Sequence, residues 1–203
     1  MIQLVGVQEL PAAVEQHLGL RDRDGRDSPV NPLFLEEAVR MLEGIGVLQR
    51  NGRVQVNEAL LAQVQVPDTI HGLLLARLDR LPVVERDLLQ VASVIGRQFA
   101  AEPLAMLSAE PSPQLVVEML VTLSAAEMTR LVEADPEWVY LFQHAMTHEV
   151  AYESLPYARR QMLHALIADW LLEVNAANLP RYTRCWRTIT AVLPTTRRGW
   201  NMP

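Results

Sequence analysis

Apolar residues recur at intervals of three and four positions along most of the chain, which is the spacing of one face of an α-helix. Proline or asparagine often precedes these stretches and glycine often follows them, as at helix starts and ends. In residues 83–95 we expect Leu88, Leu89, Val91 and Ile95 to face a core. The pattern predicts a mainly α fold with helices at residues 9–18, 31–43, 67–81, 83–95, 101–107, 113–128, 144–155 and 157–174.

Two short extended runs, residues 47–50 and 53–56, flank the pair Asn51-Gly52. Asn-Gly readily adopts the positive φ angles of a type I′ turn, which joins antiparallel strands through two residues. We therefore expect a small β-hairpin over residues 47–56. A further short strand is predicted at residues 2–5.

Residues 83–143 combine three predicted helices with a second hairpin, whose strands are expected at residues 131–133 and 138–142. This element order is that of a winged helix. The fold class we expect is mainly α: a winged helix of three helices plus a β-hairpin, with flanking lid helices and the second small hairpin at residues 47–56.

The third helix of this predicted winged helix, residues 113–128, carries Glu118 and Glu127 and no basic residue. In a DNA-binding winged helix this element enters the groove and needs cations to meet the phosphates. Across the helix and the following hairpin Arg130 alone is basic. We therefore predict that the region packs against protein and that no nucleic acid is its partner.

All 18 basic residues of the chain are Arg and none is Lys. A Walker A phosphate loop needs its Lys and Schiff-base catalysis needs an amine, so neither chemistry belongs to this chain. Residues 1–173 carry 13 Arg and 24 acidic residues, a net charge of −11, whereas residues 174–203 carry 5 Arg and no acid, a net charge of +5. An acidic body of this kind repels nucleic acid.

The sequence gives no sign of secretion or membrane insertion. The first residues lack a basic stretch followed by an apolar one, so no signal peptide is predicted. No apolar run reaches the length of a membrane span, and the single Cys185 excludes an internal disulfide. We expect a cytoplasmic protein.

His144 is the strongest candidate for chemistry, because it stands where the predicted second hairpin meets the next helix. Backbone N–H groups at a helix start favour an anion, which suggests a phosphate sensor. A histidine that caps the helix or fills a packed gap is the alternative. His148 shares its helical face, but a third ligand is missing and Ala145 stands where a zinc protease has Glu, so no metal site is predicted.

The other polar residues predict no catalytic group. Glu36 and Glu37 are expected to be solvated charges, as is the cluster of Asp22, Asp24 and Asp27. A lone cysteine in an irregular tail is seldom a nucleophile. We also expect no special role for His17, His71 and His164.

Four segments carry longer motifs. Residues 31–37 are similar to "GNPFFLEE", residues 66–82 to "lPdtv..ll.aRlDrLp", residues 88–99 to "aavIGr.F" and residues 142–164 to "F.H....VaYesL....R..lH". Together they resemble the signal-transduction ATPases of the STAND type, an AAA-related class. Its members include ATPase modules joined to bacterial class III adenylate or guanylate cyclases and to helix-turn-helix regulators. The resemblance covers about residues 2–175.

The resemblance implies the C-terminal lid and winged-helix part of such an ATPase, with the P-loop and Walker B strand upstream. It predicts a partial lid at residues 1–65 and a winged helix at residues 66–143. Residues 144–175 would be a helical pair leading to a missing tetratricopeptide-like region. Residues 176–203 depart from the family and are expected to be an irregular tail, translated out of frame.

The family also implies two nucleotide contacts. In the wider class the proline of a Gly-x-Pro motif packs against adenine, and a histidine at the junction of wing and helix reaches the β-phosphate of ADP. These roles carry over to Pro32 and His144, although Val30 stands where the motif has glycine.

The function that the resemblance predicts is a regulatory, non-catalytic segment, which senses whether ATP or ADP is bound through interdomain packing. Its partners would be the upstream P-loop domain and a cyclase or other effector domain. This chain alone is expected to hold no cofactor and to have no enzymatic activity. The alternatives are a winged-helix transcription regulator that binds DNA, a helical interaction scaffold, and a non-functional gene remnant.

Overall fold

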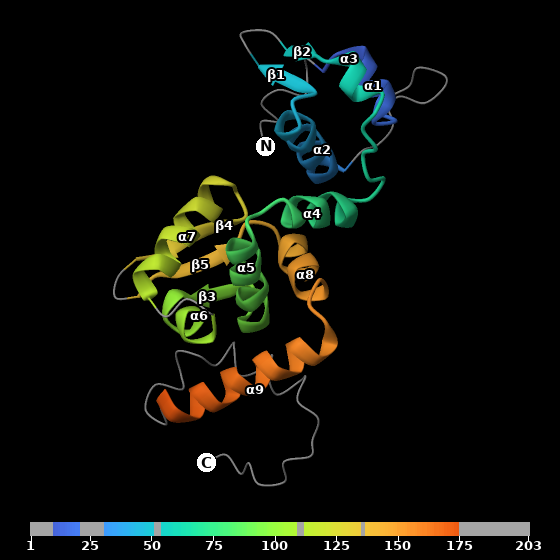
Figure 1. Ribbon diagram of the computed structural model, residues 1–203. Coiled ribbons are helices and arrows are strands. Elements are labelled where there is room, and N and C mark those ends of the chain that lie inside the picture. The colour runs from blue at the N-terminus through green and yellow to red at the C-terminus, as the bar shows by residue number, and fades with distance from the viewer. Residues whose placement is uncertain (1–9, 21–30, 51–53, 109–111, 135–136, 175–203) are drawn as a thin grey trace. The chain divides into compact units, whose positions relative to one another are not determined.

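The computed structural model of this chain is mostly helical, with two small antiparallel sheets (Figure 1), which confirms the mainly α prediction. The chain divides into two compact units, Met1–Arg77 (unit 1) and Leu78–Pro203 (unit 2). The strand predicted at residues 2–5 and the tail at residues 176–203 lie outside the described residues. The structure describes residues 10–20, 31–50, 54–108, 112–134 and 137–174.

Unit 1 is built from a short helix, a longer helix, a hairpin and a single helical turn. A small apolar core of Val14, Leu42, Val47, Leu48 and Leu61 lies between them. The first helix was expected from residue 9 and begins three residues later, because a proline precedes its first turn. The elements are α1 (Ala12–His17), α2 (Pro32–Gly44), β1 (Leu48–Arg50), β2 (Val54–Val56) and α3 (Glu58–Leu61).

The predicted hairpin of unit 1 is confirmed, but its expected two-residue turn is wrong. β1 and β2 pair antiparallel, with Arg50 opposite Val54. This register leaves residues 51–53 between the paired strand ends, where a type I′ turn would leave two. The three residues themselves lie outside the described part of the chain.

Helix α4 (Ile70–Asp79) crosses the boundary between the two units. It was expected to begin at residue 67 and begins at Ile70, because the Thr69 hydroxyl accepts a hydrogen bond from the backbone N–H of Gly72 at 3.1 Å. Such a bond is the usual role of an N-cap residue. Leu73 and Leu74 are buried, as the apolar spacing predicts.

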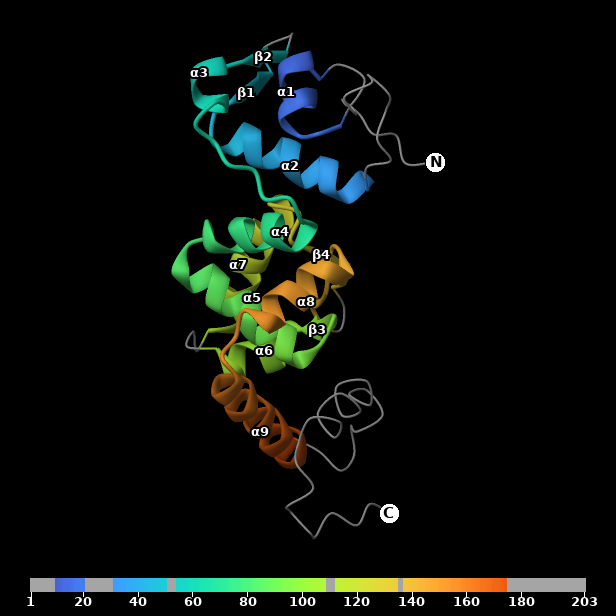
Figure 2. The ribbon, with the colours of Figure 1, turned by 90° about the vertical axis from the view of Figure 1, so that its right-hand side faces the viewer.

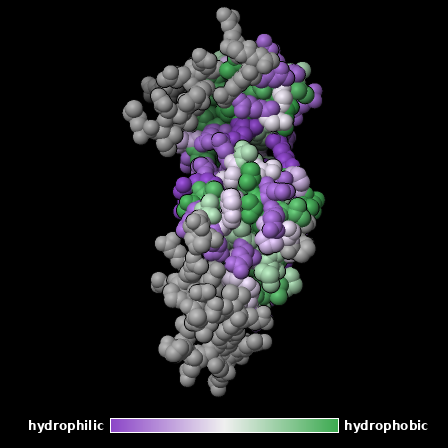
Figure 3. All heavy atoms as spheres, turned by 90° about the vertical axis from the view of Figure 1, so that its left-hand side faces the viewer, coloured by the Kyte–Doolittle hydropathy of each residue, from purple (hydrophilic) through white to green (hydrophobic). Residues whose placement is uncertain are grey.

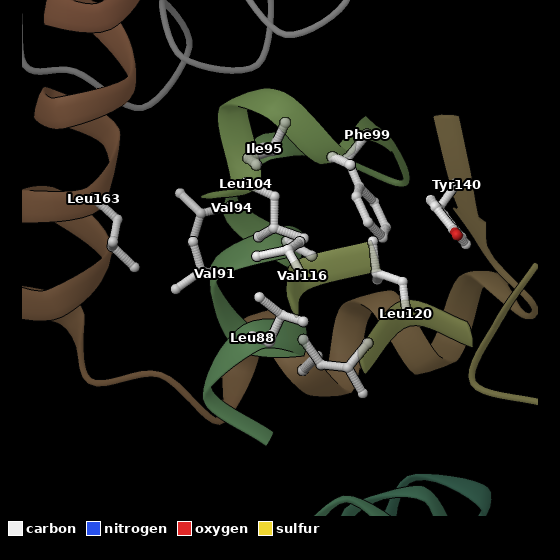
Figure 4. Close-up of a cluster of buried hydrophobic side chains, with 14 of the residues drawn as sticks. Leu88, Val91, Val94, Ile95, Phe99, Leu104, Val116, Leu120, Tyr140 and Leu163 are labelled. Carbon is white, nitrogen blue, oxygen red and sulfur yellow. The ribbon is translucent and has the colours of Figure 1, made fainter. Parts of the chain in front are cut away.

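Unit 2 has a larger core, to which its helices and its sheet contribute. Figure 4 shows side chains from α5 and α7 meeting Phe99, Tyr140 and Leu163. In Figure 2, α8 lies beside α5. The elements are α5 (Val83–Ile95), β3 (Gln98–Ala100), α6 (Ala101–Leu107), α7 (Pro113–Ala125), β4 (Thr129–Glu133), β5 (Val139–Phe142), α8 (Ala145–Glu153) and α9 (Tyr157–Val174).

Strand β3 was not expected from the sequence. It contains only three residues, and Phe99 is its single large apolar side chain, which is too little for a periodic signal. β3 pairs antiparallel with β5, with Phe99 opposite Tyr140, so the sheet has the order β3-β5-β4. The predicted second hairpin is therefore two of the three strands, and β5 lies in the centre.

Helix α7 ends at Ala125, three residues before the expected end, because Glu127 has a left-handed backbone with a φ of 53°. The N–H of Met128 donates to the carbonyl of Leu123 at 2.9 Å, and that of Glu127 donates to Ser124 at 3.0 Å. These two bonds form a Schellman motif, which usually places glycine at the left-handed position.

Helix α2 ends in the same way, with glycine at that position. Gly46 has a φ of 77°, and the N–H of Val47 donates to the carbonyl of Leu42 at 2.9 Å. The N–H of Gly46 donates to Glu43 at 3.0 Å. In both units the helix, the Schellman motif and a hairpin follow one another, and a further helix begins after the hairpin.

Candidate functional site

The junction between β5 and α8 fixes the position of His144. Pairing with both neighbours holds β5 in the centre of the sheet, and the N–H of Gln143 donates to the carbonyl of Met128 at 3.0 Å. His144 follows with an extended backbone, φ −121° and ψ 144°, and serves as the N-cap residue of α8. The sequence prediction that His144 stands at the start of this helix is confirmed.

No side chain caps the start of α8. The His144 side chain makes no capping hydrogen bond, although it occupies the N-cap position and is partly exposed. The first backbone N–H groups of a helix have no partner within the helix, and they carry a partial positive charge. The start of α8 thus offers donors to an acceptor, which is the geometry of an anion site.

The corresponding junction in unit 1 is different. After the hairpin, the N–H of Asn57 donates to the carbonyl of Val47 at 2.9 Å, as Gln143 does to Met128 in unit 2. The Asn57 side chain then accepts a hydrogen bond from the N–H of Leu60 at 3.2 Å. Asn57 therefore satisfies the first turn of α3, whereas His144 leaves that of α8 unsatisfied.

His148 has a structural role rather than the metal-binding one that its spacing would allow. Its Nε2–H donates to the carbonyl of Ser93 at 3.0 Å, and its ring meets that of Phe142 edge to face with centroids 5.3 Å apart. Burial lowers the pKa of His148, and the positive charge of Arg97 lowers it further, against the opposing effects of the Ser93 carbonyl and Glu149. His148 thus fixes α8 against α5 in its neutral form.

Arg97 also lies in this region, and the sequence pattern did not predict it as a site residue. It lies in the connection between α5 and β3, its carbonyl accepts the N–H of Phe142 at 3.0 Å, and its side chain is exposed. Its charge is close enough to act on the pKa of His148, one turn beyond His144. Only β3, which the sequence pattern did not reveal, brings Arg97 beside the end of β5.

Pro32, the second residue implied by the family resemblance, begins α2 in unit 1. Asn31 caps this helix by accepting the N–H of Leu33 at 3.0 Å, and Pro32 occupies the first helical position and is exposed. This is the ordinary placement of proline at a helix start. Pro32 belongs to unit 1 and His144 to unit 2.

Glu37 is buried, which overturns the expectation that it is a solvated charge. Its side chain is only 1% exposed, and its Oε1 lies 2.5 Å from Nη1 of Arg77 and 2.8 Å from Nη1 of Arg40. Arg40 also reaches the half-exposed Glu36, at 3.0 Å. Two segments that carry the family resemblance, residues 31–37 and 66–82, are therefore tied together by a buried ion pair.

His164 was expected to need no role, and it instead forms part of a buried polar cluster. Its side chain is fully buried, and its Nε2 lies 3.1 Å from the hydroxyl oxygen of Tyr152. The guanidinium of Arg160 lies over the Tyr152 ring, 4.8 Å from its centroid. Burial lowers the pKa of His164, and Arg160 lowers it further. These residues of the "VaYesL....R..lH" motif join α8 to α9.

Among the described residues, no group of three or more His, Cys, Asp or Glu side chains is arranged to hold a metal ion. None of the helices in the described part of the chain is long and apolar enough to cross a membrane. Comparison of the chain with models of protein families, with curated proteins and with solved structures finds no match. The candidate site is thus defined by its geometry: an uncapped helix start with His144 at its N-cap and Arg97 near it.

Proposed function

We propose that this chain is a regulatory, non-catalytic part of a signal-transduction ATPase of the STAND type. In this proposal, unit 2 is a winged helix. The order α5, β3, α6, α7, β4, β5 and the strand order β3-β5-β4 support this assignment, because a winged helix has three helices and a sheet in which the last strand pairs with the first. The four sequence motifs in residues 31–37, 66–82, 88–99 and 142–164, which resemble those of this class, also support it.

The observation that carries the proposal is the uncapped start of α8 beside His144. A phosphate group bound there would accept the free backbone N–H groups and meet the partial positive charge of the helix. In the complete protein the phosphate would belong to ADP or ATP held by a P-loop domain. A ligand shifts a conformational equilibrium only if it contacts one state better than the other, and His144 would make that differential contact.

We expect this chain alone not to hydrolyse ATP, because it contains no Lys for a phosphate loop. Purified protein should release no phosphate above background in a coupled assay. Hydrolysis that disappears when an Arg or an acidic residue of this chain is substituted would contradict the non-catalytic role.

Nuclear magnetic resonance with pyrophosphate and with ADP tests the phosphate contact directly. Both should shift the backbone amide signals of residues 145–147 at millimolar concentration, and adenosine should not. His144→Ala should abolish the shifts, and His17→Ala, a matched change on α1 in unit 1, should leave them unchanged. Shifts that survive His144→Ala, or that are absent from the start of α8, would refute a phosphate site at this junction.

The arrangement of unit 2 also favours a second candidate, a transcription regulator that binds DNA. Its weakness is charge: α7 is fully described and carries no basic residue, and Arg130 is the only one on β4 and β5. A gel-shift experiment at low salt separates the two. Specific binding that weakens in Arg130→Ala would favour the regulator, and the absence of binding would favour the ATPase part.

A further inference from the structure

Helix α9 is held to the rest of unit 2 mainly by apolar packing. It contacts α5 and α6, and its Leu163 and Ile167 are buried in the core. The ion pair between Arg159 and Asp87, at 3.5 Å, is partly exposed and contributes little, because water screens it. The sheet β3-β5-β4 does not involve α9, so the helix can leave without breaking a strand pair.

An ionisable side chain, His164, is buried where α9 meets α8. Hydrophilic side chains are visible on the surface in Figure 3, whereas the His164 ring is fully buried. Its Nε2 lies 3.1 Å from the hydroxyl oxygen of Tyr152, but its Nδ1 is buried without a hydrogen-bond partner. Buried polar atoms are nearly always paired, so the unpaired Nδ1 calls for an explanation.

The surroundings of His164 suit a neutral ring and not a protonated one. A neutral histidine ring carries one N–H group, and a protonated ring carries one on each nitrogen. Protonated His164 would therefore have two donors, with the Tyr152 hydroxyl as an acceptor at Nε2 and no acceptor at Nδ1. Burying a charge with an unpaired donor is costly, so α9 packs in place only while the ring is neutral.

Arg160 adds a positive charge beside the ring. Its guanidinium lies over the Tyr152 ring, 4.8 Å from the centroid, and its Nε donates to the carbonyl of Leu155 at 2.9 Å. The other ionisable residues with described side chains on these helices are Glu85, Arg86 and Asp87 on α5, Glu102 on α6, His148, Glu149 and Glu153 on α8, and Tyr157, Arg159 and Asp169 on α9. No carboxylate raises the pKa of His164: burial and the charge of Arg160 act on it, and both lower it.

We propose that Tyr152, Arg160 and His164 form a latch, and that a proton on His164 releases α9 while the rest of unit 2 stays folded. This inference goes beyond the proposed function and does not depend on it, because the latch lies at the opposite end of α8 from His144. In the released helix the ring meets water and takes up a proton at its ordinary pKa of about 6.5. The docked form is therefore favoured above this pH, and release grows as the pH falls below it.

Residue-resolved hydrogen exchange of the full chain tests the release of α9. Protection factors, which correct for the effect of pH on the intrinsic exchange rate, give the opening constant of the helix. From about pH 7.5 to about pH 5.5 this constant should rise about tenfold, because the released helix binds one additional proton. An opening constant that does not change over this range overturns the proposal.

Small amounts of guanidinium distinguish release of α9 from unfolding of unit 2. Exchange through release of one helix should depend weakly on the denaturant, because little surface becomes exposed. Exchange of β5, in the centre of the sheet, should depend on it steeply. If α9 and β5 respond alike at both pH values, the helix does not open separately, and the proposal is wrong.

Two further measurements assign the effect to His164. His164→Gln keeps a polar group opposite Tyr152 and binds no proton, so its α9 opening constant should be the same at both pH values. His17→Gln, the matched change in unit 1, should retain the tenfold rise, and a rise that persists in His164→Gln overturns the latch. In the parent protein, the nuclear magnetic resonance signal of the His164 ring should titrate together with the loss of α9 protection. A ring that takes up its proton while α9 stays protected refutes the proposal, whether or not His164→Gln folds.

Discussion

Each unit contains the same succession of elements: a helix, a Schellman motif, a hairpin and a second helix. α2 is followed by β1, β2 and α3, and α7 is followed by β4, β5 and α8. The two successions differ at two joints: the end of the first helix and the start of the second. Unit 1 has Gly46 in the left-handed position and Asn57 as a capping side chain, whereas unit 2 has Glu127 and His144.

This difference identifies two positions in unit 2 at which the residue type does not favour the local backbone structure. Gly46 and Asn57 are the residue types that such joints prefer. Glu127 and His144 are not, and the surrounding packing must hold them in place. Positions of this kind are expected at functional sites, where local stability is given up for another purpose. The comparison therefore marks two positions in unit 2 whose local structure is fixed by packing and not by the preference of the residue.

The sheet holds the joint between β5 and α8 in place, and Phe142→Ala should disrupt this joint. Phe142 is fully buried and contacts the rings of Phe99 and His148, so we expect unit 2 to lose about 3–5 kcal/mol. Val56→Ala, at the matching end of the hairpin in unit 1, should cost less because Val56 is only partly buried. Hydrogen exchange of residues 83–170 reports the change, and equal losses in the two units would refute the comparison.

Glu37→Ala should have the next largest effect, and it should act on unit 1, to which both Glu37 and Arg77 belong. The substitution removes the buried Glu37 carboxylate from the partly buried Arg77, which costs about 3 kcal/mol. Glu36→Ala is the control, because Glu36 is half-exposed and its pair with Arg40 contributes less than about 1 kcal/mol. Chemical denaturation, with hydrogen exchange of α2 and α4, distinguishes the two. An equal loss in the control variant would show that the buried pair does not tie α2 to α4.

Substitutions at the left-handed positions should act in opposite directions in the two units. Gly46→Ala should destabilise unit 1 by about 1 kcal/mol, because an L side chain is strained at its φ of 77°. Glu127→Gly should stabilise unit 2 by up to about 1 kcal/mol by relieving the same strain. Thermal unfolding of both variants measures these two changes in stability. Destabilisation by Glu127→Gly would mean that the interactions of Glu127 stabilise unit 2 by more than the backbone strain costs.

Mild acid should have the smallest effect and should act on unit 2. The pKa values of His148 and His164 are lowered by burial, so below about pH 6.5 the unfolded chain binds protons that the folded chain does not. The free energy of unfolding should therefore fall as the pH decreases from about 6.5. His164→Gln should reduce this slope, whereas His17→Gln, in unit 1, should not. If His164→Gln leaves the slope unchanged, His164 does not contribute to the pH dependence of stability, and the prediction is wrong.

Periodicity and turn chemistry predicted most of the elements, because each depends on residues close in sequence. The ranges of α5, α6 and α9 match their predictions, and His144 lies where it was expected. The misses depend on distant partners. β3 becomes a strand by pairing with β5, and Glu37 is buried by Arg77, 40 residues further along the chain. Arg97 could not be linked to His144 without β3.

The central place of β5 has a consequence for how the protein is made. The ribosome synthesises β3 and β4 before β5, yet both strands pair with β5. Gln98 therefore cannot pair with Leu141 until the chain up to Leu141 has been made. The sheet of unit 2 therefore closes only after residue 142 has left the exit tunnel, whereas the strands of the other hairpin meet across residues 51–53. A nascent chain that stalls between residues 100 and 139 would expose an unpaired β3, to which chaperones could bind.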